Sequence, residues 1–186
     1  FPTRRSSDLI TIVISPLISL MKDQVDSLNS AGVKATYINS TLDNNEMEQR
    51  ILLALSGYAK LLYISPERLE SDNFCQLLRT INISMIAIDE CHCVSQWGHD
   101  FRPSYRTIQP LIKSLTDRPV ISAFTATATK EVKDDVVKLL GLKNSKVYTT
   151  GFDRKNLFFS VVRGENKKDY LVKYIEDNKD QVGIIY

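Results

Sequence analysis

The amino-acid sequence predicts an α/β fold in which a mostly parallel sheet carries helices on both faces. Short apolar segments that are typical of buried strands alternate with segments whose apolar residues recur at helical spacing. Parallel strands need a crossover between them, so this regular alternation favours a parallel sheet. The 186 residues, 43% of them hydrophobic and 25% charged, suffice for one globular domain and the start of a second.

Six apolar segments are the expected strands of the first domain. Each is four to six residues long, which is too short for a typical helix, and each is followed by polar or turn-forming residues. We therefore expect strands at residues 9–14, 33–38, 61–64, 85–89, 119–124 and 146–149.

The expected helices begin and end at residues that commonly cap helices. Ser15 is the expected N-cap of the first helix, with Pro16 in its first position and Gly32 after its end. Asp43 and Glu46 have the spacing of a capping box, which predicts a helix through residue 55. Later helices are expected at about 66–79, 104–115 and 130–140, with Ser65, Pro66, Thr129 and Gly141 at their ends.

The chain is expected to contain parts of two domains. The segment TGFDRKN interrupts the alternation with glycine and charge, as an interdomain linker does. The opening FPTRRSSDL resembles a translated cloning or sequencing scar, and the chain stops inside an apolar segment, so we expect a fragment of a longer protein. The expected division is 1–8 as scar, 9–149 as first domain, 150–157 as linker and 158–186 as the start of a second domain. In that second part we expect a strand, a helix and a strand at 157–162, 168–177 and 182–186.

Composition places few limits on function. A net charge of +2 and a pI near 8.4 permit binding of nucleic acid without arguing for it. No apolar segment approaches the roughly 20 residues that span a bilayer, so we expect no membrane partner. The three cysteines include no CxxC pair, which favours a reducing cytoplasm. Zinc binding by Cys91 and Cys93 is a minor alternative, because their spacing suits a tetrahedral site poorly.

The most informative segment is DECHCVSQWGHDFRPSY, residues 89–105. Asp89 and Glu90 follow an expected buried strand, and the carboxyl ends of parallel strands are where α/β proteins bind ligands. Asp89 suits a Mg²⁺ ion held through few carboxylates and several waters, and Glu90 suits orientation or deprotonation of an attacking water. An acidic cap on the following turn is the alternative role for this pair. The next loop is rich in side chains that bind ligands: Gln96, Trp97, His99, Phe101 and Arg102.

This segment and a downstream Thr-Ala-Thr resemble motifs of RecQ-family DNA helicases of superfamily 2, whose motor consists of two RecA-like domains. The resemblance covers the chain after its first residues and implies a RecA-like three-layer α/β/α domain followed by the beginning of a second. The family's Walker B motif is joined to an aromatic-rich loop in the same way, with alanine usually in place of Cys91. By this resemblance Asp89 binds Mg²⁺ with ATP, Glu90 acts on the attacking water, and His92 links the nucleotide to the next motif.

The resemblance also implies contacts with DNA. Trp97, Phe101 and Arg102 would sense single-stranded DNA and report it to the ATP site, since bases of any sequence stack on aromatic rings. Alternatively, the two aromatic rings cover an edge of the core. The segment SAFTAT resembles motif III, in which Thr125 and Thr127 would couple hydrolysis to strand separation. Other segments resemble DNA-contacting motifs, and their candidate DNA-binding residues are Ser15, Pro16, Ser19, Gln24, Ser65, Arg68 and Arg154.

These candidate contacts have ordinary alternative roles. The first segment is also compatible with a simple capped helix, and Arg68 is placed to pair with a neighbouring glutamate. The charge of Arg154 suits a solvated linker equally well.

The implied function is that of an ATP-dependent 3′→5′ DNA helicase that uses ATP and Mg²⁺ to unwind DNA in recombination and repair. Its expected partners are single-stranded and partly duplex DNA, and its expected location is the cytoplasm, at the nucleoid in a bacterium. One alternative is a non-enzymatic DNA-binding module that has lost its phosphate-binding loop. Another is a DEAD/DEAH-type RNA helicase, against which SQWGHDFRPSY argues, because those proteins lack this loop.

We expect the 186-residue chain by itself not to hydrolyse ATP. Its sequence contains no GxxxxGK[ST] phosphate-binding loop, whose lysine and hydroxyl contact the phosphates and Mg²⁺. ATP turnover measured with single-stranded DNA should therefore equal that of a blank without protein. Turnover well above the blank would contradict this expectation.

Overall fold

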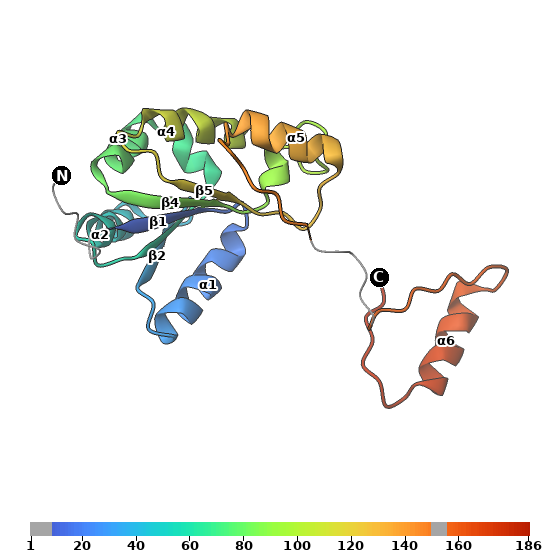
Figure 1. Cartoon of the computed structure of the whole chain (residues 1–186). Coiled ribbons are helices and arrows are strands. Elements are labelled where there is room, and N and C mark those ends of the chain that lie inside the picture. The colour runs from blue at the N-terminus through green and yellow to red at the C-terminus, as the bar shows by residue number, and fades with distance from the viewer. Residues whose placement is uncertain (1–8, 150–155) are drawn as a thin grey trace. The chain divides into compact units, whose positions relative to one another are not determined.

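The computed structural model describes residues 9–149 and 156–186, and the chain divides into two compact units between Lys146 and Val147 (Figure 1). The first unit contains the sheet and the buried core. No helix within the described ranges is both long and apolar enough to cross a membrane. The expected scar, and all of the expected linker except its last two residues, fall outside the described ranges.

Five parallel strands form one sheet in the first unit, as the alternation of elements predicts. Their bounds are β1 Ile10–Ile14, β2 Ala35–Ile38, β3 Leu61–Ile64, β4 Ile83–Ile88 and β5 Val120–Ala123. The strands lie in the order β2-β3-β1-β4-β5, so β1 is central and pairs with β3 and β4. The carboxyl ends of β1, β4 and β5 therefore meet at one edge of the sheet, where α/β proteins bind ligands.

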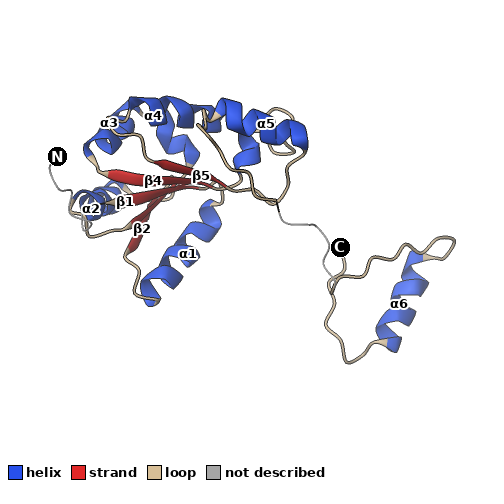
Figure 2. Cartoon of the chain, viewed as in Figure 1, coloured by secondary structure: helices blue, strands red, loops and turns tan. Residues whose placement is uncertain are grey.

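Helices cover both faces of the sheet, which gives the expected three layers (Figure 2). The helices are α1 Ile18–Ser30, α2 Asn44–Leu55, α3 Asp72–Thr80, α4 Ile108–Ser114 and α5 Lys130–Leu139, with short 3₁₀ segments η2 Pro66–Glu70, η3 Cys91–Val94 and η4 Pro103–Thr107. α1 packs through Met21 and Val25 on Tyr37 of β2. The main core lies on the other face, where alternate isoleucines of β1 pack with apolar residues of α3, α4 and α5. The large side chains of this core hold in place the strands that carry the site.

Several predicted helix ends are confirmed. Asp43 and Glu46 form the capping box that begins α2. Thr129 caps α5 with its side chain. Gly32 and Gly141 follow α1 and α5 with positive φ angles, a conformation in which glycine is not strained.

Other predicted helix ends are wrong. Ser15 does not cap α1, which begins at Ile18 after an N-cap at Leu17 that makes no side-chain hydrogen bond. Ser15 Oγ accepts the backbone N–H of Leu17 at 3.4 Å, one residue before the helix, and donates its proton across the sheet to Asp89. The expected helix at 66–79 is broken into η2 and α3, because Ser71 caps α3 anew. The expected helix at 104–115 likewise starts as the 3₁₀ segment η4.

Three predicted strands are wrong. Residues 146–149, 157–162 and 182–186 form no strand in the structure. An extended segment becomes a strand only when a neighbouring strand satisfies its N–H and C=O groups, and the described residues supply no such neighbour for these segments. The predicted helix of the second unit is present as α6 (Lys167–Asp177), with Asn166 as its cap and no buried residue.

Candidate functional site

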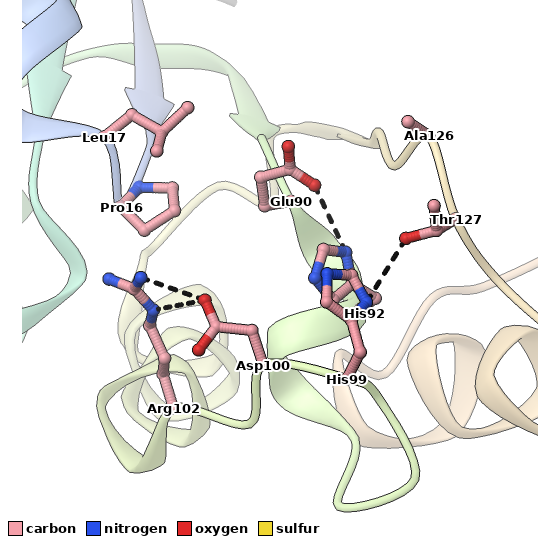
Figure 3. Close-up of a pocket in the computed structure, with 9 residues that line it drawn as sticks. All are labelled: Pro16, Leu17, Glu90, His92, His99, Asp100, Arg102, Ala126 and Thr127. Atoms are coloured by element: carbon pink, nitrogen blue, oxygen red, sulfur yellow. Dashed lines mark hydrogen bonds and ion pairs between the residues drawn. The ribbon is translucent and has the colours of Figure 1, made fainter. Parts of the chain in front are cut away.

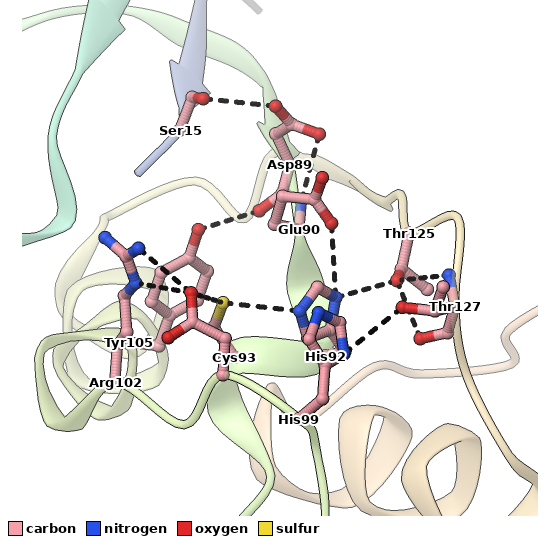
Figure 4. A network of polar contacts seen from close by, with 11 residues as sticks. Ser15, Asp89, Glu90, His92, Cys93, His99, Arg102, Tyr105, Thr125 and Thr127 are labelled. Carbon is pink, nitrogen blue, oxygen red and sulfur yellow. Dashed lines mark hydrogen bonds and ion pairs between the residues drawn. The ribbon is translucent and has the colours of Figure 1, made fainter. Parts of the chain in front are cut away.

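Asp89 lies where the central strands β1 and β4 end side by side (Figure 4). Its backbone N–H donates to the Ile14 carbonyl at 2.9 Å, and the Ser15 hydroxyl donates to Asp89 Oδ2 at 3.1 Å. Asp89 Oδ1 accepts the backbone N–H of Glu90 at 2.9 Å. The carboxylate is thus oriented by both strands, and each oxygen retains a lone pair with which to accept a further hydrogen bond.

Tyr105 holds the backbone of Asp89 from within the core. The ring is fully buried, and its hydroxyl donates to the Asp89 carbonyl at 2.8 Å. Burial raises the pKa of Tyr105 far above its usual value, so the hydroxyl remains a donor. Sequence reasoning noted Tyr105 only as the last residue of the motif and missed this role. The sequence signal for this role was the position of Tyr105 at the end of a segment whose other residues suit ligand binding.

Glu90 begins a sharp turn directly after β4. Its backbone is left-handed, with φ 45° and ψ 44°, a conformation that strains residues with a side chain. The turn brings Glu90 Oε2 to 3.2 Å from His92 Nδ1. Such strain is concentrated at functional sites, where the fold must direct one side chain against its local preference.

We expect Glu90→Gly to be more stable than Glu90→Ala by about 1 kcal/mol. Both variants lack the carboxylate, so their difference isolates the left-handed backbone, which glycine adopts without strain. Urea denaturation of the two variants measures this difference. In a regular helix or strand alanine is the more stable residue by roughly 0.5–1 kcal/mol. If Glu90→Ala were more stable than Glu90→Gly, this result would argue against a strained backbone at position 90.

His92 is buried and connects Glu90 to the segment after β5 (Figure 4). Its Nδ1 lies 2.9 Å from Thr125 Oγ1 and 3.2 Å from Glu90 Oε2. Thr125 Oγ1 donates to the Thr127 carbonyl at 3.0 Å, so it accepts from His92, and Nδ1 carries the proton. Desolvation, and next the nearby His99, lower the pKa of His92, so the ring is neutral at pH 7.

His99 forms a second connection between the same two segments. Its ring stacks on that of His92, with centroids 4.1 Å apart and planes inclined by 21°. His99 Nδ1 lies 3.3 Å from Thr127 Oγ1. His92 of η3 and His99 of the aromatic loop, residues 95–102, thus both contact residues 125–127. Of the predicted loop residues, His99 is therefore brought to Thr127, and its ring stacks on that of His92.

The remaining aromatic residues of the loop differ in exposure. Trp97 is 79% exposed, so it does not cover an edge of the core, and Gln96 is exposed beside it. Phe101 is half-buried, and the Arg106 guanidinium lies 5.1 Å from its ring. Of the two rings, Trp97 is therefore the more accessible to an incoming base.

Arg102 is held within the loop by Asp100. Its Nε and Nη2 donate to Asp100 Oδ2 at 3.0 and 2.9 Å. This hydrogen bonding lowers the pKa of Asp100, so the pair is ionised at neutral pH. A phosphate that binds Arg102 must therefore compete with this carboxylate. Sequence reasoning did not single out Asp100, although an acid two positions from an arginine was the available signal.

A cavity of about 280 Å³ opens between these groups (Figure 3). Its walls come from the segments that follow β1, β4 and β5, and they mix charged, aromatic and small side chains. The lining residues are Pro16, Leu17, Glu90, His92, His99, Asp100, Arg102, Ala126 and Thr127. Of the predicted catalytic and coupling residues, the cavity is thus lined by Glu90, His92, His99, Arg102 and Thr127, and not by Asp89 or Trp97.

The other predicted DNA contacts are placed differently. Ser19 and Gln24 are exposed on α1 and accessible to a ligand. Ser65 is buried, and its hydroxyl has no hydrogen-bond partner among the described residues. The guanidinium of Arg68 lies 5.4 Å from an aromatic ring of α3 and pairs with no glutamate in the described part of the chain. Arg154 lies outside the described residues.

The buried thiols argue against the zinc alternative. Burial raises the pKa of Cys91 to about 12 and that of Cys93 to about 11. Among the described residues, no third histidine, cysteine or acidic side chain completes a group with these thiols that could hold a metal. Cys93 Sγ lies 3.7 Å from His92 Nε2, and the two side chains pack as part of the core beneath the loop.

Comparisons with known proteins identify relatives that cover nearly the whole chain. The ATP-dependent DNA helicase RecQ of Bacillus subtilis is 54% identical over 176 residues, which are 95% of this chain and 30% of that protein. The protein of the same name from Haemophilus influenzae is 42% identical over 179 residues, which are 96% of this chain and 29% of that protein. The chain therefore spans about 30% of the length of these relatives.

Structural similarity agrees with these relatives at the level of the fold. The crystal structure of the Pyrococcus furiosus Hef helicase domain matches 74% of this chain and 28% of its own, with a TM-score of 0.54 and 19% identity. The family model of the DEAD/DEAH box helicases matches residues 3–135, which include all five strands, both carboxylates and both imidazoles. The chain therefore belongs to the DEAD/DEAH box helicase family and, by its relatives, to the RecQ type within it.

Proposed function

We propose that this chain supplies the site for ATP-bound Mg²⁺ and the DNA sensor of an ATP-dependent 3′→5′ DNA helicase. The observation that carries the proposal is the series of contacts from Glu90 through His92 to Thr125, with the exposed Trp97 in the adjoining loop. In this proposal the intact protein unwinds partly duplex DNA during recombination and repair, and works in the cytoplasm, at the nucleoid in a bacterium. The RecQ relatives support DNA over RNA as substrate.

The carboxylate of Asp89 fits an ion that is bound mainly through water and phosphate. Hydrogen bonds from Ser15 and from the backbone of Glu90 use one lone pair on each oxygen, which leaves the others for water on Mg²⁺. The described residues contain no group of three or more acidic, histidine or cysteine side chains that could hold a metal by themselves. Mg²⁺ bound with ATP neutralises charge on the phosphates.

Glu90 is the residue that orients the attacking water and accepts its proton. Its side chain is 31% exposed, and its Oε2 lies 3.2 Å from His92 Nδ1, whose proton is donated to Thr125, so the carboxylate remains available to water. His92 also bonds Thr125 and stacks on His99, so a displacement of the aromatic loop moves the group that positions Glu90. DNA binding to the loop thereby changes the alignment of the attacking water.

The experiment that tests this function uses the protein in full length. ATP hydrolysis is measured with and without single-stranded DNA, and strand separation is measured on DNA and RNA duplexes with either a 3′ or a 5′ tail. We expect DNA-stimulated hydrolysis and separation of DNA duplexes with a 3′ tail. Asp89→Asn and Glu90→Gln should abolish hydrolysis while they leave binding of single-stranded DNA in place.

Each alternative function predicts a different result. Preferred separation of RNA duplexes would indicate an RNA helicase, and DNA binding without any hydrolysis would indicate a non-enzymatic module. Either result would overturn the proposal. Separation that requires a 5′ tail would overturn its polarity alone.

A further inference from the structure

Ser95 lies at the start of the aromatic loop and is fully buried. Its backbone N–H donates to the His92 carbonyl, and its carbonyl accepts the Gly98 N–H, each at 3.1 Å. Its hydroxyl oxygen accepts the backbone N–H of Trp97, also at 3.1 Å. Ser95 thus fixes the backbone on which the exposed Trp97 ring is carried.

The hydroxyl proton of Ser95 is directed to another element. Ser95 Oγ donates to Asp135 Oδ2 of α5 at 2.7 Å, across a separation of 40 residues. A short hydrogen bond to a carboxylate is stronger than one between neutral groups. It also fixes the rotation of the hydroxyl, so that a lone pair faces the Trp97 N–H. The Ser95 hydroxyl therefore links Asp135 of α5 to the backbone of Trp97.

The turn that follows Ser95 has little freedom to move. A Cβ atom added to Gly98 would lie 2.4 Å from the His92 carbonyl oxygen, so the loop backbone packs directly against η3. Because the loop backbone lies this close to η3, it cannot shift far. The direction of the Trp97 side chain therefore depends on the hydrogen bonds of Ser95, where the turn begins.

η3 and the aromatic loop together contact the chain after β5 at three points. His92 bonds Thr125 at 2.9 Å, and His99 bonds Thr127 at 3.3 Å. The third contact is that of Ser95 with α5, which begins directly after the segment containing Thr125 and Thr127. The first two contacts involve groups around the cavity, whereas the third lies at the root of the loop, next to Trp97.

We propose that Asp135 is a positioning residue that holds Trp97 in its DNA-binding orientation through Ser95 and joins the aromatic loop to α5 as one moving body. The proposal rests on the proposed function in one respect, namely that Trp97 contacts DNA. No feature of the sequence around Asp135 marks it, because α5 reads as an ordinary amphipathic helix. The neighbouring Asp134 is exposed and provides a matched control.

The first experiment measures the loop without DNA. Trp97 is the only tryptophan of the chain, so its fluorescence anisotropy reports the mobility of this loop. Asp135→Ala and Ser95→Ala should lower the anisotropy, whereas Asp134→Ala should not. Alanine favours a helix more than aspartate does, so both aspartate variants should keep α5 folded, which thermal unfolding verifies. Asp135→Asn retains an acceptor for the Ser95 hydroxyl and should restore most of the anisotropy.

The second experiment measures binding of single-stranded DNA through the same fluorescence. Loss of one hydrogen bond to a carboxylate should weaken binding about tenfold in Asp135→Ala and in Ser95→Ala. The double variant should be no weaker than either single variant, because both remove one interaction. Equal anisotropy and equal affinity in Asp135→Ala and Asp134→Ala would overturn the inference, and so would additive losses in the double variant.

The two experiments separate this inference from the proposed function. If DNA leaves the fluorescence of the unchanged chain unaltered and does not bind, the DNA-sensing function fails. The anisotropy without DNA still decides whether Asp135 positions Trp97.

Discussion

Replacement of Tyr105 by alanine is expected to lower the free energy of unfolding by about 3–5 kcal/mol. The ring is fully buried in the main core, in one cluster with residues of η3, α3, α4 and α5. Its removal leaves a cavity, and the Asp89 carbonyl loses the hydrogen bond from the Tyr105 hydroxyl. Urea denaturation followed by circular dichroism measures the change. We expect Tyr105→Ala to have the largest effect of the substitutions considered.

Tyr105→Phe is the matched control for this variant. It keeps the ring and removes only the hydroxyl, so it should cost about 1 kcal/mol. The fully buried ring then accounts for the remainder of the alanine effect. Equal losses in the two variants would mean that the hydrogen bond to Asp89, and not packing, dominates. A loss below 1 kcal/mol in both would contradict the buried position of the ring.

Replacement of Trp97 by alanine is expected to weaken binding of single-stranded DNA by ten- to a hundredfold. A base stacked on an aromatic side chain contributes about 1–3 kcal/mol, largely independent of its sequence. The side chain is 79% exposed, so its loss should leave the free energy of unfolding nearly unchanged. Binding of a dye-labelled oligonucleotide measures the affinity, because this variant lacks the intrinsic tryptophan signal.

A comparison of two variants distinguishes stacking from other contacts of the loop. Trp97→Phe keeps an aromatic face and should lose less affinity than Trp97→Ala, at the same salt concentration in both measurements. Phe101→Ala removes a half-buried ring and should lower stability as well as affinity. Unchanged affinity in Trp97→Ala would show that the loop binds DNA without stacking on this ring.

Local sequence signals predicted much of the fold. The capping box at Asp43, the cap at Thr129 and the glycines after α1 and α5 are confirmed, because these interactions involve residues only a few positions apart. The cap at Ser15 is wrong, because α1 begins only at Ile18, and the Ser15 hydroxyl also donates to Asp89, 74 residues away. The break at Ser71 is a cap inside the segment 66–79, for which one continuous helix was expected.

The residues of the candidate site likewise divide into those that the local sequence predicts and those whose roles depend on the fold. The carboxylate pair, the aromatic loop and Thr125 were found from the sequence, since their motifs are contiguous and rich in chemical groups. Tyr105 and Asp100 lie within or next to those motifs, but their roles follow from contacts made only in the folded chain. Asp135 carries no sequence signal at all, since it is an acid on an ordinary helix.

The sequence by itself determined the class of fold, the family and the segment that contains the chemistry. Periodicity, capping and motif spacing act between near neighbours, so they can be read along the chain. Only the tertiary structure decided which of these segments meet: Ser15 bonds Asp89 across 74 residues, His92 bonds Thr125 across 33, and Ser95 bonds Asp135 across 40. Those contacts depend on the order of the strands in the sheet, which is settled by packing of the whole core and not by local preference.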